Sequence, residues 1–125
     1  MTYRKQLLIT TAVLTMAPFA AQAAADNWNG NTSNAWNTKT NWSTGAVPGT
    51  TSAVTIGVTK NSPVQLNVNS SLNGSGGSLT IGSAEELDIN SGFTLTMGAN
   101  AVTLNGILAG PGTLSSTARI VCSAH

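Results

Sequence analysis

The sequence predicts an all-β fold, and within that class a parallel β-solenoid, in which short strands stack in successive turns. Apolar and polar residues alternate through residues 54–104, as in half-buried strands, and no sustained helical period follows the first 25 residues. Two short stretches also recur: residues 79–82 resemble 95–98, sixteen residues later, and 87–90 resemble 102–105, fifteen later. Like residues at like positions are what stacking requires. A β-sandwich built from hairpins accounts for the strand number almost as well and stays open as the alternative.

A cleavable N-terminal signal helix is predicted over residues 1–23. Arg4 and Lys5 form its basic start, an apolar stretch follows, and the small residues Ala21 and Ala23 offer a cleavage site. The apolar stretch is too short for a permanent membrane anchor. The sequence therefore predicts export through the Sec machinery, to the periplasm, the cell surface or the medium, and the near-absence of cysteine fits the outer surface of a Gram-negative bacterium.

The remaining chain is long enough for one domain with a modest core. Its charged residues are three cations against four anions, a net charge of −1: Lys39, Lys60 and Arg119 against Asp26, Glu85, Glu86 and Asp88. Nothing here is basic enough to hold a nucleic-acid backbone, so a nucleic-acid partner is not expected. A lone cysteine, Cys122, cannot form an internal disulfide, and the fold must hold without one.

Residues 24–50 are expected to form a tryptophan-rich N-terminal cap. They contain all three tryptophans, Trp28, Trp36 and Trp42, at even spacings that place the indoles on one side of an extended backbone. One interpretation is an aromatic plug that closes the end of a β core, since large aromatic residues usually serve burial. The other is a row of indoles that stacks on sugar rings.

Residues 51–117 are expected to form the solenoid repeats. Strands are predicted wherever apolar residues alternate with polar ones, separated by corners rich in Gly, Asn and Pro: 54–58, 64–68, 79–81, 87–89, 93–97 and 102–104. Pro63 ends one such turn because it cannot donate to a strand ladder. Two strands per repeat follow from this interpretation.

Catalytic chemistry finds little support in the sequence. His125 is the only histidine, so neither a Ser-His-Asp nor a Cys-His arrangement is expected, and no metal-ligand spacing or cofactor motif occurs. Glu86 and Asp88 would share one strand face, opposite Leu87 and Ile89, and could offer two carboxylates for acid-base work on a sugar or for binding Ca2+. A solvated outer face is the simpler interpretation. We therefore expect no enzyme, no catalytic residue, no metal site and no cofactor.

Residues 118–125 are predicted to be an irregular tail, because they bring together Arg119, Cys122 and His125 and lack the Gly and Asn corners seen earlier. A frameshift or a premature stop would produce such an ending. A solenoid that ended here would leave its last strands open, so self-association is expected of the truncated chain.

The cap segment resembles the opening of bacterial autotransporter passengers, where a secretory signal is followed by a W-x-G…W…NW…G…P stretch. The matching residues are Trp28-Asn29-Gly30, Ala35-Trp36, Asn41-Trp42-Ser43, Gly45 and Val47-Pro48-Gly49. The resemblance implies a right-handed β-solenoid that a C-terminal outer-membrane barrel carries to the cell surface. One departure is large, since no barrel follows in this sequence.

The predicted function is the N-terminal fragment of a surface-displayed or secreted passenger with a structural or adhesive role. Its expected partners are glycans or proteins of a host surface or matrix. The alternative is a secreted carbohydrate-binding module that uses Trp28, Trp36 and Trp42 as its stacking platform.

Overall fold

The structure is a computed structural model that describes residues 24–122. The predicted signal and its cleavage residues Ala21 and Ala23 lie outside these residues, as does His125. The described chain forms eleven strands and one short 3-10 helix: β1 (Ala24–Asn27), η1 (Lys39–Asn41), β2 (Ser52–Ile56), β3 (Val64–Leu66), β4 (Ser70–Ser71), β5 (Ser78–Ile81), β6 (Glu86–Ile89), β7 (Thr94–Gly98), β8 (Val102–Leu104), β9 (Ile107–Ala109), β10 (Thr113–Ser116) and β11 (Ile120–Cys122). The predicted all-β class is confirmed. Within the described range, no helix is long and apolar enough to cross a membrane.

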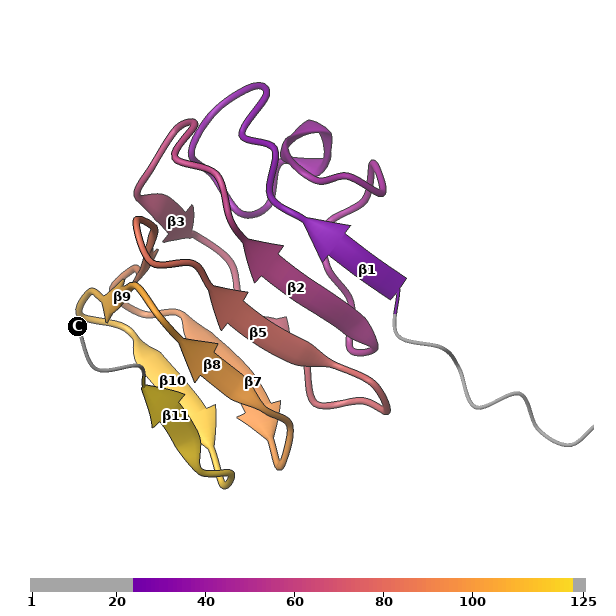
Figure 1. Ribbon diagram of the computed structural model, residues 1–125, viewed down its shortest axis with the longest axis vertical. Helices are drawn as coiled ribbons and strands as arrows, with labels where there is room; N and C mark the ends of the chain where they lie inside the picture. The colour runs from indigo at the N-terminus through magenta and orange to yellow at the C-terminus, as the bar shows by residue number, and fades with distance from the viewer. Residues whose placement is uncertain (1–23, 123–125) are drawn as a thin grey trace, which may run out of the picture.

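The strands form three sheets, and neighbouring strands within each sheet run parallel. The strand orders are β1-β2-β5-β8-β11, β3-β6-β9 and β4-β7-β10. From β2 onwards each sheet therefore takes every third strand of the chain, and Figure 1 shows the largest sheet as a ladder from β1 to β11. Hairpins would make neighbouring strands antiparallel. The strands therefore do not form the hairpin-built sandwich that the sequence left open.

Alternation along each strand sends apolar residues inward, where they stack on residues of the next strand. Val54 lies opposite Leu79, which lies opposite Val102, in the register of β2, β5 and β8. All three side chains are buried. The same arrangement on the other sheets gives one continuous core: Trp28, Trp36, Trp42, Val54, Ile56, Val64, Leu66, Leu72, Leu79, Ile81, Leu87, Ile89, Leu95, Met97 and Val102.

The repeat inferred from the sequence does not give the stacking register. Residues 79–82 and 95–98 were expected to stack, but they belong to β5 and β7, which lie in different sheets. Leu79 instead pairs with Val102, 23 residues later. The expectation failed because, from β2 onwards, consecutive strands of the chain are distributed over three sheets rather than two. The resemblance between the stretches reflects the shared pattern of a strand followed by a Gly corner, which does not identify the sheet.

Both ends of the strand stack differ from the predicted boundaries. β1 lies inside the segment expected to be the cap, yet it pairs in parallel with β2, from Ala24 opposite Ser52 to Asn27 opposite Thr55. Residues 120–122, expected in an irregular tail, form β11 and pair with β8. β-branched Ile120 and Val121 fit a strand edge, which explains why the pairing continues past the last Gly corner.

Candidate functional site

The three tryptophans meet at the end of the core that lies next to β1. Trp28 follows β1 and its main-chain N–H donates to Thr55 O at 2.9 Å, while Trp36 N–H donates to Gln65 O at 2.9 Å beside an isolated bridge between Ala35 and Gln65. The segment between β1 and β2 thus bonds through Trp28 to a strand of one sheet, β2, and through Trp36 to a strand of another, β3, and the ring of Trp42, after η1, lies between the other two indoles. Its ring centroid is 5.0 Å from that of Trp28 and 4.8 Å from that of Trp36, at interplanar angles of 79° and 72°.

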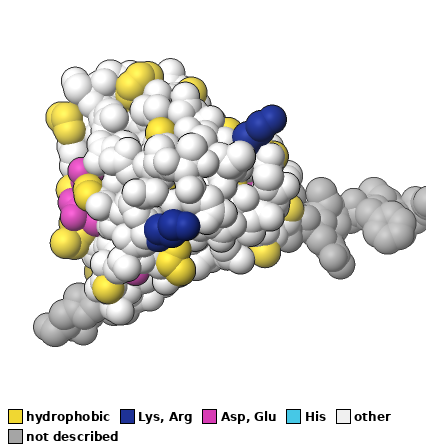
Figure 2. Space-filling view, turned by 90° about the horizontal axis from the view of Figure 1, so that it is seen from above, with side chains coloured by type: hydrophobic (Ala, Val, Ile, Leu, Met, Phe, Trp, Pro, Cys, Tyr) yellow, Lys and Arg dark blue, Asp and Glu magenta, His cyan; other side chains and the backbone are white. Residues whose placement is uncertain are grey.

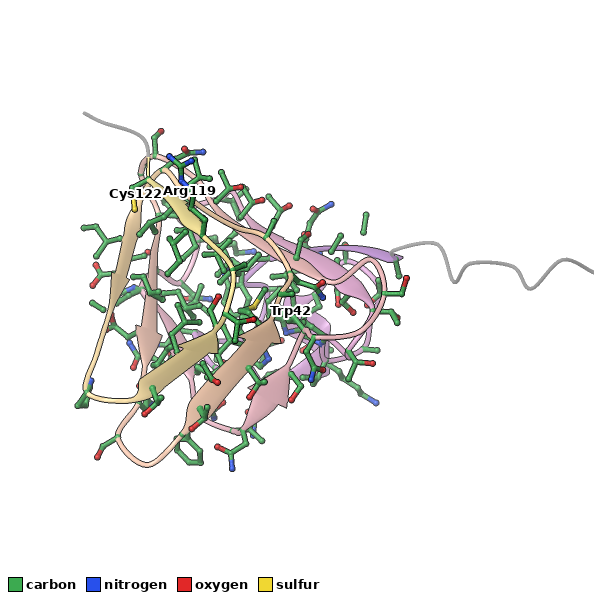
Figure 3. All side chains as sticks on the ribbon, turned by 90° about the horizontal axis from the view of Figure 1, so that it is seen from below. Trp42, Arg119 and Cys122 are labelled. Carbon is green, nitrogen blue, oxygen red and sulfur yellow. The ribbon has the colours of Figure 1, made fainter. Side chains whose placement is uncertain are left out.

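This geometry is the edge-to-face arrangement that aromatic rings prefer. None of the three residues exposes more than 2% of its surface. Figure 3, seen from the opposite end, labels Trp42 within the outline of the three sheets. The even spacing in the sequence did not produce this convergence, because the segment is not one extended strand. It bends between the sheets and passes through η1.

The indole nitrogens have different partners. Trp28 Nε1 donates to Lys60 O at 3.0 Å, and Trp42 Nε1 donates to Trp36 O at 2.7 Å. Trp36 Nε1 is buried without a partner. An unpaired buried N–H lowers stability, so the burial of Trp36 is held by packing rather than by its polar atom.

Asn41 is the polar centre of the cap, and its side chain is completely buried. Its Oδ1 accepts from the main-chain N–H groups of Thr32 and Ser33, at 2.8 and 3.1 Å. Its Nδ2 donates to Ala35 O at 2.9 Å and to Ser33 Oγ at 3.1 Å. The main-chain oxygen of Asn41 also accepts from Asn29 N at 2.7 Å. One side chain therefore satisfies the main-chain groups of a loop that has no ladder of its own.

Sequence reasoning recognised Asn41 only as part of the motif around Trp42 and gave it no role. A signal was available, because an asparagine between turn-forming residues is the residue type that bonds main-chain groups in loops. The sequence could not tell that this particular asparagine faces the core.

Gly30 is required by its backbone conformation and by its surroundings. Its φ is +58°, in the left-handed region that favours glycine, and a Cβ there would clash with Lys60 O and approach Trp28 Nε1 to 2.9 Å. The hydrogen bond between Trp28 Nε1 and Lys60 O runs through the space that such a side chain would fill. This explains why glycine closes the Trp28-Asn29-Gly30 motif.

Asp26 is a buried carboxyl in an apolar column. It lies opposite Val54 in the register of β1 and β2 and exposes 1% of its surface. Thr44 Oγ1 donates to Asp26 Oδ1 at 3.1 Å. Burial raises the pKa of Asp26 above its usual value, and the hydrogen bonds from Thr44 partly offset that rise. The carboxyl ties the loop after Trp42 to the first strand.

The acidic cluster, Glu85, Glu86 and Asp88, is divided between the inner and outer faces of the β3-β6-β9 sheet. Glu86 and Asp88 alternate with buried Leu87 and Ile89 on β6, which confirms that the two carboxyls share the outer face. Asp88 Oδ2 accepts from Gln65 Nε2 at 3.1 Å. A hydrogen bond with Asp88, together with burial and the charge of Asp88, raises the pKa of Glu86. Glu85 lies inward instead, and burial raises its pKa.

Among residues 24–122, no group of three or more His, Cys, Asp and Glu side chains is arranged to hold a metal ion. The arrangement on β6 is a pair of neighbouring half-buried carboxyls on the outer face, next to an amide from β3. The cap differs in that its central polar side chain, Asn41, is completely buried and makes four hydrogen bonds to neighbouring residues of its own loop. The cap is therefore the best-defined side-chain cluster of the described chain.

The described residues define an all-β protein of three parallel sheets with an indole cluster at one end. A protein family described as a domain of unknown function (DUF8693) matches residues 27–121, and the chain belongs to this family. No curated protein and no solved structure matches the chain.

Proposed function

We propose that the chain is the N-terminal part of a surface-displayed or secreted passenger of the autotransporter type, with a structural or adhesive role and no catalysis of its own. We further propose that its three sheets are the three faces of a right-handed parallel β-solenoid. The observation that carries the proposal is the cap: Trp28, Trp36 and Trp42 close one end of a core that the three sheets surround. These residues are the ones that carry the resemblance to passenger openings.

The order of the strands supports the solenoid. A chain that visits three sheets in turn and pairs each strand with the one three places later advances by one strand spacing per turn. Such a stack can be extended by adding turns, since each turn contacts only its neighbours. A closed beginning is what a stack of this kind needs if it is to grow in one direction only.

The outer faces support an adhesive role. Thr55, Thr80 and Thr103 lie opposite one another on the outer side of β2, β5 and β8. Ser71, Thr96 and Ser115 do the same on β4, β7 and β10. Rows of uncharged hydroxyl groups suit contacts with glycans or proteins of a host surface or matrix, because hydroxyls donate and accept hydrogen bonds without a charge to desolvate.

A carbohydrate-binding module that stacks sugars on the tryptophans is the other function considered from the sequence. Stacking needs an open ring face, and the three indoles are packed against one another and the core. Figure 2 looks onto the cap end and shows mostly uncharged side chains and backbone, with scattered hydrophobic groups and a few basic and acidic side chains. No observation favours this second function.

Export is the decisive test of the proposal. The complete chain, expressed in a Gram-negative host, should lose residues 1–23 and appear outside the cytoplasm, as shown by intact mass and cell fractionation. A variant with Ala21→Phe and Ala23→Phe should keep the leader, because the cleavage site requires small residues. Unprocessed wild-type protein in the cytoplasm would refute the passenger assignment.

A further inference from the structure

The outer face of the β4-β7-β10 sheet carries two rows of uncharged polar side chains, one on each side of the buried Leu95. The first row joins residues that lie opposite one another in the register of the three strands: Ser71, Thr96 and Ser115. In the second row Thr94 lies opposite Thr113, and the side-chain oxygen of Asn69, next to β4, accepts from Thr94 N–H at 2.9 Å. Each strand is thus associated with two polar groups on the outer face.

The hydroxyl groups of these two rows are available to an external partner. Two of the five residues that carry them are exposed and three are half-buried: Thr113 and Ser115, then Ser71, Thr94 and Thr96. Within residues 24–122, none of these five hydroxyls makes a hydrogen bond to another protein group. The cap uses its hydroxyls internally instead, as Thr44 does when its Oγ1 donates to Asp26.

No charged side chain lies on these three strands. The charged residues of the described chain belong to other strands, to η1 or to loops: Asp26, Lys39, Lys60, Glu85, Glu86, Asp88 and Arg119. A polysaccharide with carboxylate or sulfate groups is held by basic side chains, which this face lacks. Charge complementarity therefore favours a neutral ligand.

The other two outer faces offer fewer polar groups in register. On the β1-β2-β5-β8-β11 sheet Thr55 and Thr80 lie opposite one another, but Ala53 lies opposite Ser78 in the neighbouring row. On the β3-β6-β9 sheet the carboxyl of Glu86 lies opposite Ile107. The β4-β7-β10 sheet is the one in which every strand has an uncharged polar group in both rows.

The spacing of the rows suits one kind of ligand. Parallel strands lie about 4.7–4.9 Å apart, and outward positions two residues apart on one strand are separated by about 6.6 Å. An extended glycan of equatorially linked pyranoses advances by nearly the strand spacing with each sugar, and its hydroxyls project from both sides of the chain. Such a chain, laid across the strands, places one sugar over each strand and hydroxyls near both rows.

We propose that the β4-β7-β10 face binds a neutral, extended polysaccharide that runs across the strands, with one sugar over each strand. The proposal rests on the adhesive role proposed above and gives that role a surface and a ligand class. Each threonine of the face supplies a hydroxyl that donates and accepts hydrogen bonds. The three strands carry no aromatic side chain, so binding depends on hydrogen bonds to several sugars in register rather than on stacking against one.

The test is the dissociation constant of the purified, processed protein for cellohexaose, a β-1,4-linked glucose oligomer, measured by NMR titration. Maltohexaose contains the same sugars, but its α-1,4 linkages coil the chain, so it should bind more weakly. Thr94→Val and Thr96→Val keep the branched side-chain shape and remove one hydroxyl each. Each should raise the dissociation constant for cellohexaose about three- to tenfold. Thr59→Val, which removes an exposed hydroxyl from the loop between β2 and β3, is the matched control and should leave the constant unchanged.

Thermal unfolding of every variant shows whether the fold is intact. Absence of cellohexaose binding would overturn the proposal, and equal binding of maltohexaose would overturn the match between sugar and strand spacing. A loss of affinity in Thr80→Val as large as in Thr96→Val would contradict the choice of face. Adhesion to immobilised fibronectin that falls in Thr96→Val, without any binding of cellohexaose, would assign the face to a protein partner instead.

The outcomes also separate this proposal from the function on which it rests. Exported protein that does not bind cellohexaose would refute the glycan face and leave the passenger proposal intact. Cellohexaose binding by a protein that is never exported, and that Thr94→Val and Thr96→Val weaken, would do the reverse.

Discussion

Trp42 Nε1 donates a 2.7 Å hydrogen bond to the carbonyl oxygen of Trp36, and both groups are buried. The bond joins the two indoles that also pack edge to face. Trp36 gives no corresponding bond from its own nitrogen. The two side chains are similarly buried but contribute differently. The Trp42 indole contributes packing and a hydrogen bond, whereas the Trp36 indole contributes packing alone.

Replacing each of these two indoles by phenylalanine should distinguish the contribution of the hydrogen bond from that of packing. Trp42→Phe leaves the carbonyl of Trp36 buried and unpaired, whereas Trp36→Phe removes an N–H that has no partner. We expect Trp42→Phe to cost about 1–3 kcal/mol more in the free energy of unfolding. Urea denaturation of both variants measures the difference. Equal costs would show that the hydrogen bond adds nothing to stability.

Complete removal of the Trp36 side chain should destabilise the protein severely. Trp36→Ala opens a cavity in a position with no exposed surface, at an expected cost of about 3–5 kcal/mol. A domain of this size has about 5–15 kcal/mol to lose, so the thermal midpoint should fall far. In the wild type the indoles should emit at short wavelength and resist quenching. Unchanged thermal unfolding of Trp36→Ala would contradict the plug.

The buried asparagine offers a sharper test of the cap loop. Asn41→Ala removes four side-chain hydrogen bonds and leaves main-chain groups of Thr32, Ser33 and Ala35 without their partner. We expect a loss of about 2–4 kcal/mol. Asn37→Ala is the matched control, since its bond to Asn67 is exposed and should be worth far less. Chemical denaturation compares the two, and similar losses would show that Asn41 is not the centre of the loop.

Stability should fall as the pH rises above the ordinary Asp value. The pKa of Asp26 is raised in the folded protein above the reference value of 3.8, so the folded state holds this proton more tightly than the unfolded chain. Its contribution is then present at low pH and is lost as the pH rises from 3.8 through the raised value. Asp26→Asn keeps an oxygen that can accept from Thr44 and carries no charge. At neutral pH this variant should unfold at a higher temperature than the wild type, and its stability should depend less on pH; a less stable variant at neutral pH would refute the prediction.

The two faces of β2 should respond differently to a charge. Ile56→Asp places an unpaired carboxylate in the core and should prevent folding, whereas Thr55→Asp lies on the outer face and should be tolerated. Circular dichroism and the yield of soluble protein compare the variants. If both fold equally well, β2 does not have the register described here.

The sequence by itself determined the strand faces and the all-β class. Alternation of Val54, Thr55 and Ile56, or of Glu86, Leu87 and Asp88, gives the buried and exposed sides directly, because side chains in a strand point to opposite faces in turn. It also showed that residues 28–48 differ from the rest of the chain. These properties depend on residues next to one another, which is why local patterns suffice.

Only the tertiary structure decided which strands are neighbours and where the cap is held together. Leu79 pairs with Val102 rather than with the similar sequence sixteen residues on, because parallel pairing joins strands whose separation depends on loop lengths. Asn41 became the centre of the cap because the loop folds back over it, which no local pattern specifies. Likewise Asp26 looks like an ordinary charged residue in the sequence until its register with Val54 places it in the core. Pairing and burial are properties of residues brought together from distant positions, so they are fixed by the fold.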